Sequence, residues 1–311
     1  MHIAQIGTGR VGRPTAYTIL CAGLADTLTV CDTKPGLAAA FAEELKHVTA
    51  STGNSTEIVA ADKDEGVANA DLILISAGEP RTPGVKMSRR DLAEKNAQII
   101  KAVSEAVAPR NPAAKYIVIS NPVDAMGMVC QKYTKAEFVI STGTNLESLR
   151  FRAKIAQLLG VPVNQVQGYV GGEHGEAAIP LWSTTKIQNQ PLNAYLSSTS
   201  KTIDKEQAAN YVKTVSKQIV DDIGATEYGP AASFRDITRA IVKDTNETLS
   251  IATSQKFPEL PQSVLVGIPT QLGNKIKKTQ YNNLTAEEQQ GIIQAAKAIY
   301  QTYQQTIEKI E

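Results

Sequence analysis

The sequence predicts an α/β fold, in which a doubly wound parallel sheet is followed by an α+β domain with antiparallel strands. In the first half, short apolar runs alternate with helical patterns, and this alternation is typical of β-α-β units. The apolar runs are continuous, which indicates a sheet covered on both faces. A glycine-rich turn between the first run and the first helical pattern supports the same prediction.

The elements of the first half are predicted in chain order. Strands are expected at residues 3–6, 28–31, 72–76, 116–120 and 138–140, and helices at 14–23, 37–48 and 92–107. The boundary is expected near Gly143, which gives a dinucleotide-binding domain over residues 1–142 and a substrate-binding domain over 143–311.

The second half has a different character. A helix is expected over residues 146–159 and a strand around 166–170. Runs at 263–269 and 275–281 flank the turn Gly273-Asn274, so they predict an antiparallel pair. Thr285 and Glu288 predict a capping box at the start of the last helix. Its apolar stripe consists of residues 292, 293, 296, 299, 300, 303 and 307.

The composition is that of an ordinary globular protein. Hydrophobic residues make up 42% of the 311, and 32 Lys and Arg balance 31 Asp and Glu, so no basic excess points to nucleic acid or membranes. Cys21, Cys31 and Cys130 are far apart and lack metal-ligand spacing, so they are expected to be buried thiols and no metal site is predicted. With neither a basic leader nor a long apolar segment in view, we expect a cytoplasmic protein.

The segment Gly7-Thr8-Gly9-Arg10-Val11-Gly12 lies directly between the first predicted strand and the first predicted helix. In this setting the first glycine permits a tight turn, the second lets a pyrophosphate approach the backbone, and the third lets helix and strand pack closely. The N–H groups at the helix start face the phosphate charge. The segment therefore predicts a Rossmann dinucleotide site containing Gly7, Gly9, Arg10, Val11 and Gly12.

Asp32 supports this site, because it stands at the end of the second predicted strand, 20 residues after Gly12. A carboxylate there accepts hydrogen bonds from the ribose hydroxyls and repels a 2′-phosphate. The sequence therefore favours NAD over NADP, although Lys34 weakens that preference. The alternative is a glycine-rich turn that binds no ligand. The strand before the turn, the helix after it and the acidic Asp32 together argue against this alternative.

His174 is the histidine with a functional setting. It follows the strand around 166–170 and has glycines on both sides, in Gly171-Gly172-Glu173-His174-Gly175, which leaves room for a ligand. His2 lies in the first strand and His47 near the end of a helical pattern, so both are expected to be structural or solvent-facing.

Five segments in chain order resemble the lactate/malate dehydrogenase family, and within it the archaeal-type malate dehydrogenases that are similar to lactate dehydrogenases. They are residues 7–12, Ser76-Ala77-Gly78-Glu79-Pro80-Arg81, Ser120-Asn121-Pro122-Val123-Asp124, residues 143–152 and Gly172-Glu173-His174-Gly175. The resemblance covers essentially the whole chain. It implies reversible hydride transfer between (S)-malate or oxaloacetate and NAD, as in the tricarboxylic acid cycle.

The resemblance also implies roles for single residues. His174 would be the acid/base, Arg150 would hold the substrate C1 carboxylate with its planar fork, and Arg89 would polarise the substrate carbonyl. Asn121 would form a hydrogen bond in the same catalytic centre. The peptide bond between Asn121 and Pro122 is expected to be cis. Glu147 stands where the family has Asp. Its carboxylate would orient His174 from one methylene further out, and a displacement of ~1 Å can slow catalysis up to ~100-fold.

Arg81 is implied to select the substrate. Family members that use malate carry Arg at this position, and those that use lactate carry Gln. A second guanidinium balances the C4 carboxylate of malate, whereas pyruvate leaves that charge unpaired at a high cost. Arg81 therefore favours malate dehydrogenase over lactate dehydrogenase.

Further cofactor residues follow from the same resemblance. They are Ala77, Gly78, Asn96, Ser120 and Asn121. The loop after Arg81 is longer than usual, so Arg90 competes with Arg89 for the polarising role and Lys86 becomes an extra contact. Pro83 and Gly84 suit a lid hinge, Glu176 replaces a common Asp, and residues 225–232 resemble an active-site helix start.

Several alternatives stay open. The altered loop allows a broader 2-hydroxyacid dehydrogenase, and Glu147 could mark the decayed site of a non-catalytic NAD-binding regulator. The retention of His174, Arg150 and Asn121 argues against the regulator. The expected partners are the dicarboxylate substrate and other copies of the chain, as a homotetramer or homodimer, with no nucleic acid or membrane.

Overall fold

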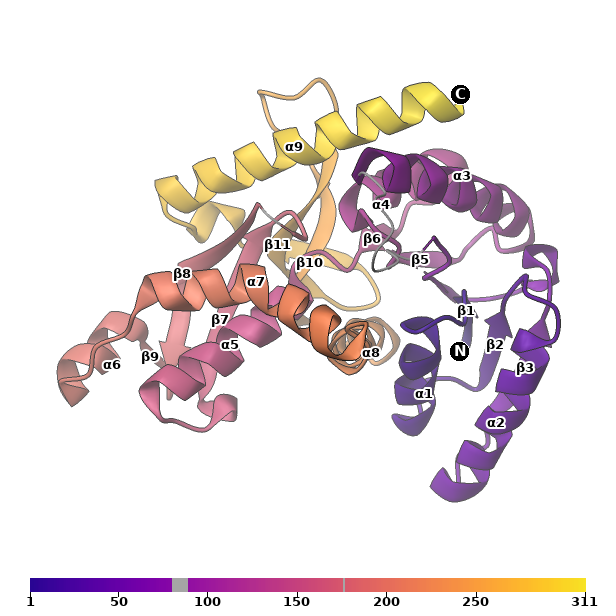
Figure 1. Cartoon of the computed structure of the whole chain (residues 1–311), viewed down its shortest axis with the longest axis horizontal. Helices are drawn as coiled ribbons and strands as arrows, with labels where there is room; N and C mark the ends of the chain where they lie inside the picture. The colour runs from indigo at the N-terminus through magenta and orange to yellow at the C-terminus, as the bar shows by residue number, and fades with distance from the viewer. Residues whose placement is uncertain (80–88, 176) are drawn as a thin grey trace.

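A mixed sheet, which has twelve strands in the part of the chain that the structure describes, forms the framework of the protein (Figure 1). The computed structural model describes residues 1–79, 89–175 and 177–311, with the backbone alone for 89–91. Within these residues the strand order is β3-β2-β1-β4-β5-β6-β10-β11-β7-β8-β9, and β12 pairs with β11. The predicted fold class is confirmed.

The first six strands are parallel and have the doubly wound order 3-2-1-4-5-6, which reverses between β1 and β4. These strands are β1 (His2–Ile6), β2 (Thr27–Cys31), β3 (Glu57–Ala61), β4 (Leu72–Ile75), β5 (Lys115–Val118) and β6 (Val139–Ser141). The helices between them are α1 (Gly12–Cys21), α2 (Leu37–Thr52), α3 (Arg89–Val107) and α4 (Val123–Thr134). Ligands bind at the carboxyl ends of such strands, next to the reversal point.

The remaining strands pair antiparallel. They are β7 (Val166–Gly172), β8 (Ala178–Ile187), β9 (Gln190–Pro191), β10 (Glu247–Gln255), β11 (Val264–Leu272) and β12 (Ile276–Thr279). The helices here are α5 (Asn145–Leu159), α6 (Leu192–Thr199), α7 (Lys205–Ile223), α8 (Tyr228–Val242) and α9 (Ala286–Ile310). The β11–β12 pair and the Thr285–Glu288 capping box confirm two predictions.

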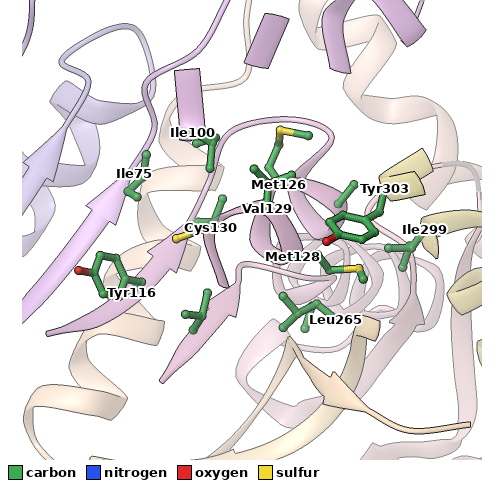
Figure 2. Close-up of a cluster of buried hydrophobic side chains, with 14 of the residues drawn as sticks. Ile75, Ile100, Tyr116, Met126, Met128, Val129, Cys130, Leu265, Ile299 and Tyr303 are labelled. Carbon is green, nitrogen blue, oxygen red and sulfur yellow. The ribbon is translucent and has the colours of Figure 1, made fainter. Parts of the chain in front are cut away.

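Apolar side chains from both halves of the chain share one core. Figure 2 shows part of it, where helix α9 packs against α4. The labelled residues come from β4, α3, β5, α4, β11 and α9, and they are Ile75, Ile100, Tyr116, Met126, Met128, Val129, Cys130, Leu265, Ile299 and Tyr303. A second cluster joins α1 to α8 and β10. The division at residue 142 stays a prediction, because these cores cross it.

The cysteine prediction is wrong at one position. Cys31 and Cys130 are buried, but Cys21 is exposed. Cys21 ends helix α1, whose neighbouring residues Ile19 and Leu20 fill the inward positions, so its thiol faces outward. None of the helices in the described residues is both long and apolar enough to span a bilayer.

Candidate active site

The loops after β1 and β4 approach each other so closely that two positions accept only glycine. A Cβ on Gly7, which has φ +85°, would lie 2.5 Å from the backbone nitrogen of Ala77. A Cβ on Gly12 would lie 1.9 Å from the carbonyl oxygen of Gly7. Ser76 Oγ donates to that same oxygen at 2.9 Å. The tight turn and the close helix–strand packing that the motif predicts are therefore present.

Gly9 differs from the other two glycines, because a Cβ there would meet no protein atom within 4 Å. The absence of a side chain is therefore not required by packing and leaves space at the start of helix α1. A pyrophosphate fits this space, since backbone N–H groups at a helix start favour anions. Val11 is the N-cap of α1. Arg10 is largely exposed and lies 4.0 Å from Glu227 Oε1.

Asp32 lies just past β2 and faces the same loop. Its Oδ2 accepts hydrogen bonds from Thr8 N at 2.8 Å and from Thr8 Oγ1 at 2.9 Å. Its Oδ1 accepts from Lys34 N at 3.0 Å. A carboxylate offers about four lone-pair positions, so acceptor capacity remains for ribose hydroxyls. Thr8, which the sequence analysis did not single out, thus fixes the carboxylate in place.

Asn96 joins two further loops at this edge of the sheet. Its Oδ1 accepts from Glu79 N, and its Nδ2 donates to the carbonyl oxygen of Asn121, both at 2.6 Å. Gly78 lies beside it, because a Cβ there would be 3.1 Å from Asn96 Oδ1. Ser120 Oγ donates to the carbonyl oxygen of Ala77 at 2.6 Å. The expected cofactor residues of these two loops are therefore gathered at one place.

The peptide bond between Asn121 and Pro122 is cis, as predicted. It lies between β5 and α4, and Asn121 is exposed there. The amide side chain is therefore accessible at the edge where the cofactor residues meet.

His174, in the loop after β7, forms a connected group with Glu147 and Arg150 of α5. His174 Nδ1 lies 3.1 Å from Glu147 Oε2, and Arg150 Nη1 donates to Glu147 Oε1 at 3.2 Å. Glu147 and Arg150 are one helical turn apart on α5, so the carboxylate serves both partners. The Glu147 side chain is only 4% exposed, whereas that of His174 is 25% exposed. The longer Glu side chain therefore reaches the imidazole.

The charges in this group shift one another's pKa values. Burial lowers the pKa of His174, but the Glu147 carboxylate outweighs burial and raises that pKa to about 8. Burial raises the pKa of Glu147, and the charge and hydrogen bond of His174, with Arg150, lower it further than burial raises it. Burial also lowers the pKa of Arg150. Glu147 therefore stays ionised beside an imidazole poised near neutral pH.

This geometry assigns the two nitrogens of His174. An ionised carboxylate only accepts hydrogen bonds, so Nδ1 carries the proton that faces Glu147. Nε2 is then the ring nitrogen that Glu147 leaves available to a ligand. Arg150 uses one of its five N–H groups on Glu147 and keeps others for a carboxylate. The group can thus hold a carboxylate and move a proton beside it.

Asp124 joins the His174–Glu147–Arg150 group to the loop that carries Asn121, and sequence reasoning did not assign it a role. It lies in the first turn of α4, directly after the Asn121–Pro122 loop, and its Oδ2 accepts from His174 N at 3.0 Å. Ser141 Oγ on β6 donates to its Oδ1 at 2.6 Å. The sequence carried one signal, namely a single carboxylate among the apolar residues of 123–130.

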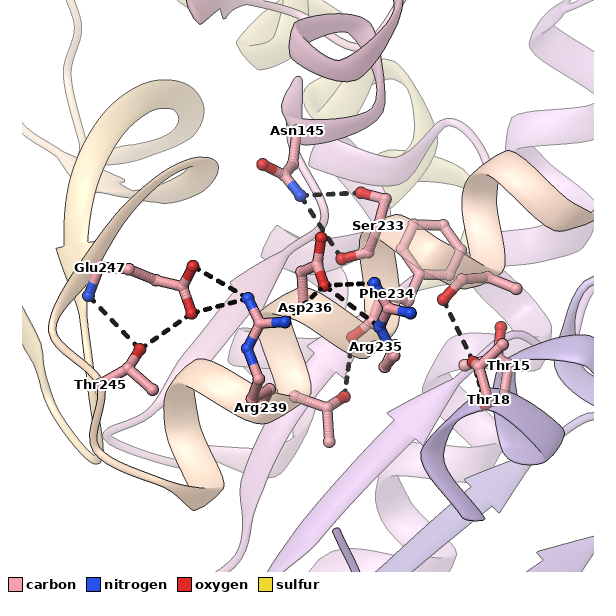
Figure 3. Close-up of polar contacts among 12 residues, drawn as sticks. Thr15, Thr18, Asn145, Ser233, Phe234, Arg235, Asp236, Arg239, Thr245 and Glu247 are labelled. Atoms are coloured by element: carbon pink, nitrogen blue, oxygen red, sulfur yellow. Dashed lines mark hydrogen bonds and ion pairs between the residues drawn. The ribbon is translucent and has the colours of Figure 1, made fainter. Parts of the chain in front are cut away.

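Helix α8 packs between α1 and α5, the helix that carries Glu147 and Arg150, as Figure 3 shows in part. Asn145 Nδ2 at the start of α5 donates to Ser233 Oγ at 2.9 Å, and Thr18 Oγ1 of α1 donates to the carbonyl oxygen of Ala231 at 3.3 Å. Arg239 donates to both oxygens of Glu247, which ties α8 to β10. The expected active-site helix therefore contacts both parts of the site.

Several expected site residues lie outside the part of the chain that the structure describes. These are Arg81, Pro83, Gly84, Lys86 and Glu176, together with the side chains of Arg89 and Arg90. Among the described residues, no three His, Cys, Asp or Glu side chains are grouped to hold a metal ion. His2 bonds to Thr29 and Asn69 within the fold, and His47 is exposed, as expected.

Comparison with known proteins covers the whole chain. The family model of the lactate/malate dehydrogenase NAD binding domain matches residues 1–138, and that of the alpha/beta C-terminal domain matches 144–310. The malate dehydrogenase of Sulfurisphaera tokodaii is 37% identical over 99% of this chain and 97% of its own length. That of Sulfolobus acidocaldarius is 34% identical over 100% and 98%.

Solved structures agree with these relatives. The malate dehydrogenase of Plasmodium falciparum superposes with a TM-score of 0.92 at 25% identity, over 100% of both chains. A lactate dehydrogenase from a deep-sea metagenome gives 0.90 at 25% identity, over 98% of both chains. The chain therefore belongs to the lactate/malate dehydrogenase family, and its N-terminal part is that family's NAD-binding domain.

Proposed function

We propose that this protein is a malate dehydrogenase that interconverts (S)-malate and oxaloacetate with NAD. The observation that carries the proposal is the His174–Glu147–Arg150 group, held at the cofactor edge of the sheet. The 37% and 34% identical relatives named malate dehydrogenase also support it, since the relatives named L-lactate dehydrogenase are about 30% identical.

The chain's own residues supply the binding and the proton transfer. Residues 7–12 and Asp32 would hold NAD, which would supply a hydride acceptor for oxidation and a hydride donor for reduction. Arg150 pairs with the C1 carboxylate and thereby orients the reacting carbon. Nε2 of His174 takes the hydroxyl proton during oxidation and returns it during reduction. Glu147 stabilises the imidazolium that forms, as the acid of a triad does.

Arginines whose side chains lie outside the described part of the structure complete the proposed site. Arg81 balances the C4 carboxylate and so selects malate over lactate. Arg89 or Arg90, at the start of helix α3 after the lengthened loop, polarises the carbonyl together with Asn121. Asp32 selects NAD over NADP through the ribose hydroxyls.

The deciding experiment measures NADH consumption by the pure protein with oxaloacetate, with pyruvate, and with NADPH in place of NADH. We expect fast turnover with oxaloacetate and NADH alone. Arg81→Gln should lose oxaloacetate turnover and gain some on pyruvate, whereas Arg110→Gln, in a turn before β5 at the opposite edge of the sheet, should change neither. Fast turnover of pyruvate by the unaltered protein would favour a lactate dehydrogenase. Tight NADH binding without turnover would favour a regulator.

We further propose a cytoplasmic homotetramer, with a homodimer as the alternative, that acts in the tricarboxylic acid cycle. Light scattering coupled to size-exclusion chromatography distinguishes the two assemblies, and a monomer at micromolar concentration would contradict both.

A further inference from the structure

Asp124 is a buried carboxylate whose surroundings are unusual for its helix. The buried residues beside it on α4 are apolar or glycine, and Asp124 itself is 2% exposed. A buried carboxylate is tolerated when donors surround it. Here one oxygen accepts from Ser141 Oγ at 2.6 Å and the other accepts from His174 N at 3.0 Å. Burial raises the pKa of Asp124, and these two hydrogen bonds act in the opposite direction.

The hydrogen bond to His174 crosses from one half of the chain to the other, over 50 residues of sequence. His174 lies in a loop between Gly172 and Gly175, whose φ angles are 90° and 139°. A Cβ on Gly172 would lie 2.4 Å from the carbonyl oxygen of Ala177, whereas one on Gly175 would meet no atom within 4 Å. The loop is thus tight on one side of His174 and open on the other. Asp124 holds the histidine's main chain between them.

Three charged side chains act on the imidazole within the described residues. Glu147 and Arg150 come from α5, and Asp124 comes from α4. Glu147 bonds the ring directly, Asp124 adds a second negative charge, and Arg150 opposes both with its positive charge. Losing Asp124 would therefore remove both a main-chain anchor and half of the negative charges that favour the imidazolium.

We propose that Asp124 is a positioning residue for His174, which fixes the main chain of the histidine and supplies a second carboxylate that stabilises its protonated ring. This inference rests on the proposed function of His174 as acid/base. It extends that function to a residue that does not touch the substrate.

Two variants separate the anchor from the charge. Asp124→Asn keeps an oxygen that accepts from His174 N but removes the charge, and Asp124→Ala removes both. Histidine-selective NMR follows the His174 ring directly, because the chain has only three histidines. We expect the His174 titration to move to lower pH in Asp124→Asn. In Asp124→Ala we expect kcat for oxaloacetate reduction to fall roughly 10- to 100-fold with little change in KM.

Glu288→Gln is the matched control. Glu288 is also buried and accepts from the backbone N and the hydroxyl of Ser183, at 3.0 and 2.6 Å, on β8. This variant should lower stability without moving the His174 titration or kcat. A merely structural role for Asp124 would make its variants behave in the same way, and that result would overturn the proposal.

Two further outcomes are decided in advance. If the Asp124 variants do not fold, Ser141→Ala removes the hydrogen bond that favours the ionised carboxylate of Asp124, so the His174 titration should move to lower pH, and an unchanged titration would contradict the proposal. If the unaltered protein has no turnover with any acid, the proposed function fails, but the NMR titration still tests whether Asp124 acts on His174.

Discussion

Glu147→Gln tests the centre of the proposed mechanism, because it removes the buried charge and keeps the length of the side chain. The pKa of His174 stands at about 8 against an ordinary value of 6.5, and Glu147 is the largest cause of the rise. A difference of this size corresponds to about 2 kcal/mol in favour of the imidazolium. Burial alone lowers the pKa of His174, so we expect that pKa to fall to its ordinary value or below in the variant.

The consequence for reduction follows from the fraction of imidazolium. At pH 7.5, a group with a pKa of about 8 is roughly three quarters protonated, and one with a pKa near 6.5 is about one tenth protonated. Oxaloacetate reduction needs the protonated ring, so kcat/KM should fall roughly eightfold from protonation alone. Malate oxidation needs the neutral ring, so the change in protonation should act on its kcat/KM in the opposite direction.

The assay measures kcat/KM in both directions between pH 6 and 9, with NADH absorbance as the signal. The reduction profile of Glu147→Gln should begin to fall at lower pH than that of the unaltered protein. Glu44→Gln, at an exposed position on α2, controls for the loss of a carboxylate elsewhere. Coincident pH profiles for Glu147→Gln and the unaltered protein would refute the reasoning, because His174 would then owe its protonation to other groups.

Two further predictions concern the cofactor loop and the pH dependence of stability. Gly9→Ala should leave the melting temperature unchanged, since its Cβ meets no protein atom, yet weaken NADH binding by roughly tenfold or more, ~1.4 kcal/mol. Gly12→Ala should instead lower the melting temperature, because its Cβ would lie 1.9 Å from Gly7 O; equal NADH affinity in Gly9→Ala would contradict the assignment. The folded-state pKa of His174 is raised, so the pairing of its imidazolium with Glu147 contributes its full stabilisation below pH 6.5. This contribution is lost as the pH rises through about 8. Urea unfolding should therefore show a loss of up to about 2 kcal/mol over that range, and an equal loss in Glu147→Gln would argue against this origin.

The parts of the fold that the sequence predicts best have local signals. The β1–α1 turn, the β11–β12 pair and the start of α9 each depend on residues close together in sequence. Strand β3 was not predicted, because it is an edge strand with most of its side chains partly or fully exposed. Strand β10 was missed because it buries polar residues. Ser250 is fully buried there and donates to the carbonyl oxygen of Val170 at 2.5 Å.

The same distinction applies to the site. The glycines, Asp32 and His174 stand in recognisable local settings, and the structure places them at the expected ends of strands. Asp124 has no such setting, because its partners Ser141 and His174 are 17 and 50 residues away. A role that depends on a distant donor becomes visible only when the chain is folded.

Helix α9 limits how this protein can be recombined with its relatives. It is the last element of the chain, yet its side chains share a core with α3 and α4 (Figure 2), and Lys309 pairs with Glu94 at 2.5 Å. Lys101 Nζ also donates to the carbonyl oxygen of Ile310 at 3.1 Å. A chimera joined at Gly143 would therefore set a foreign α9 against the native α3 and α4. A chimera that keeps this packing has to take helix α9 from the same parent as the NAD-binding part of the chain, whose helices α3 and α4 it covers.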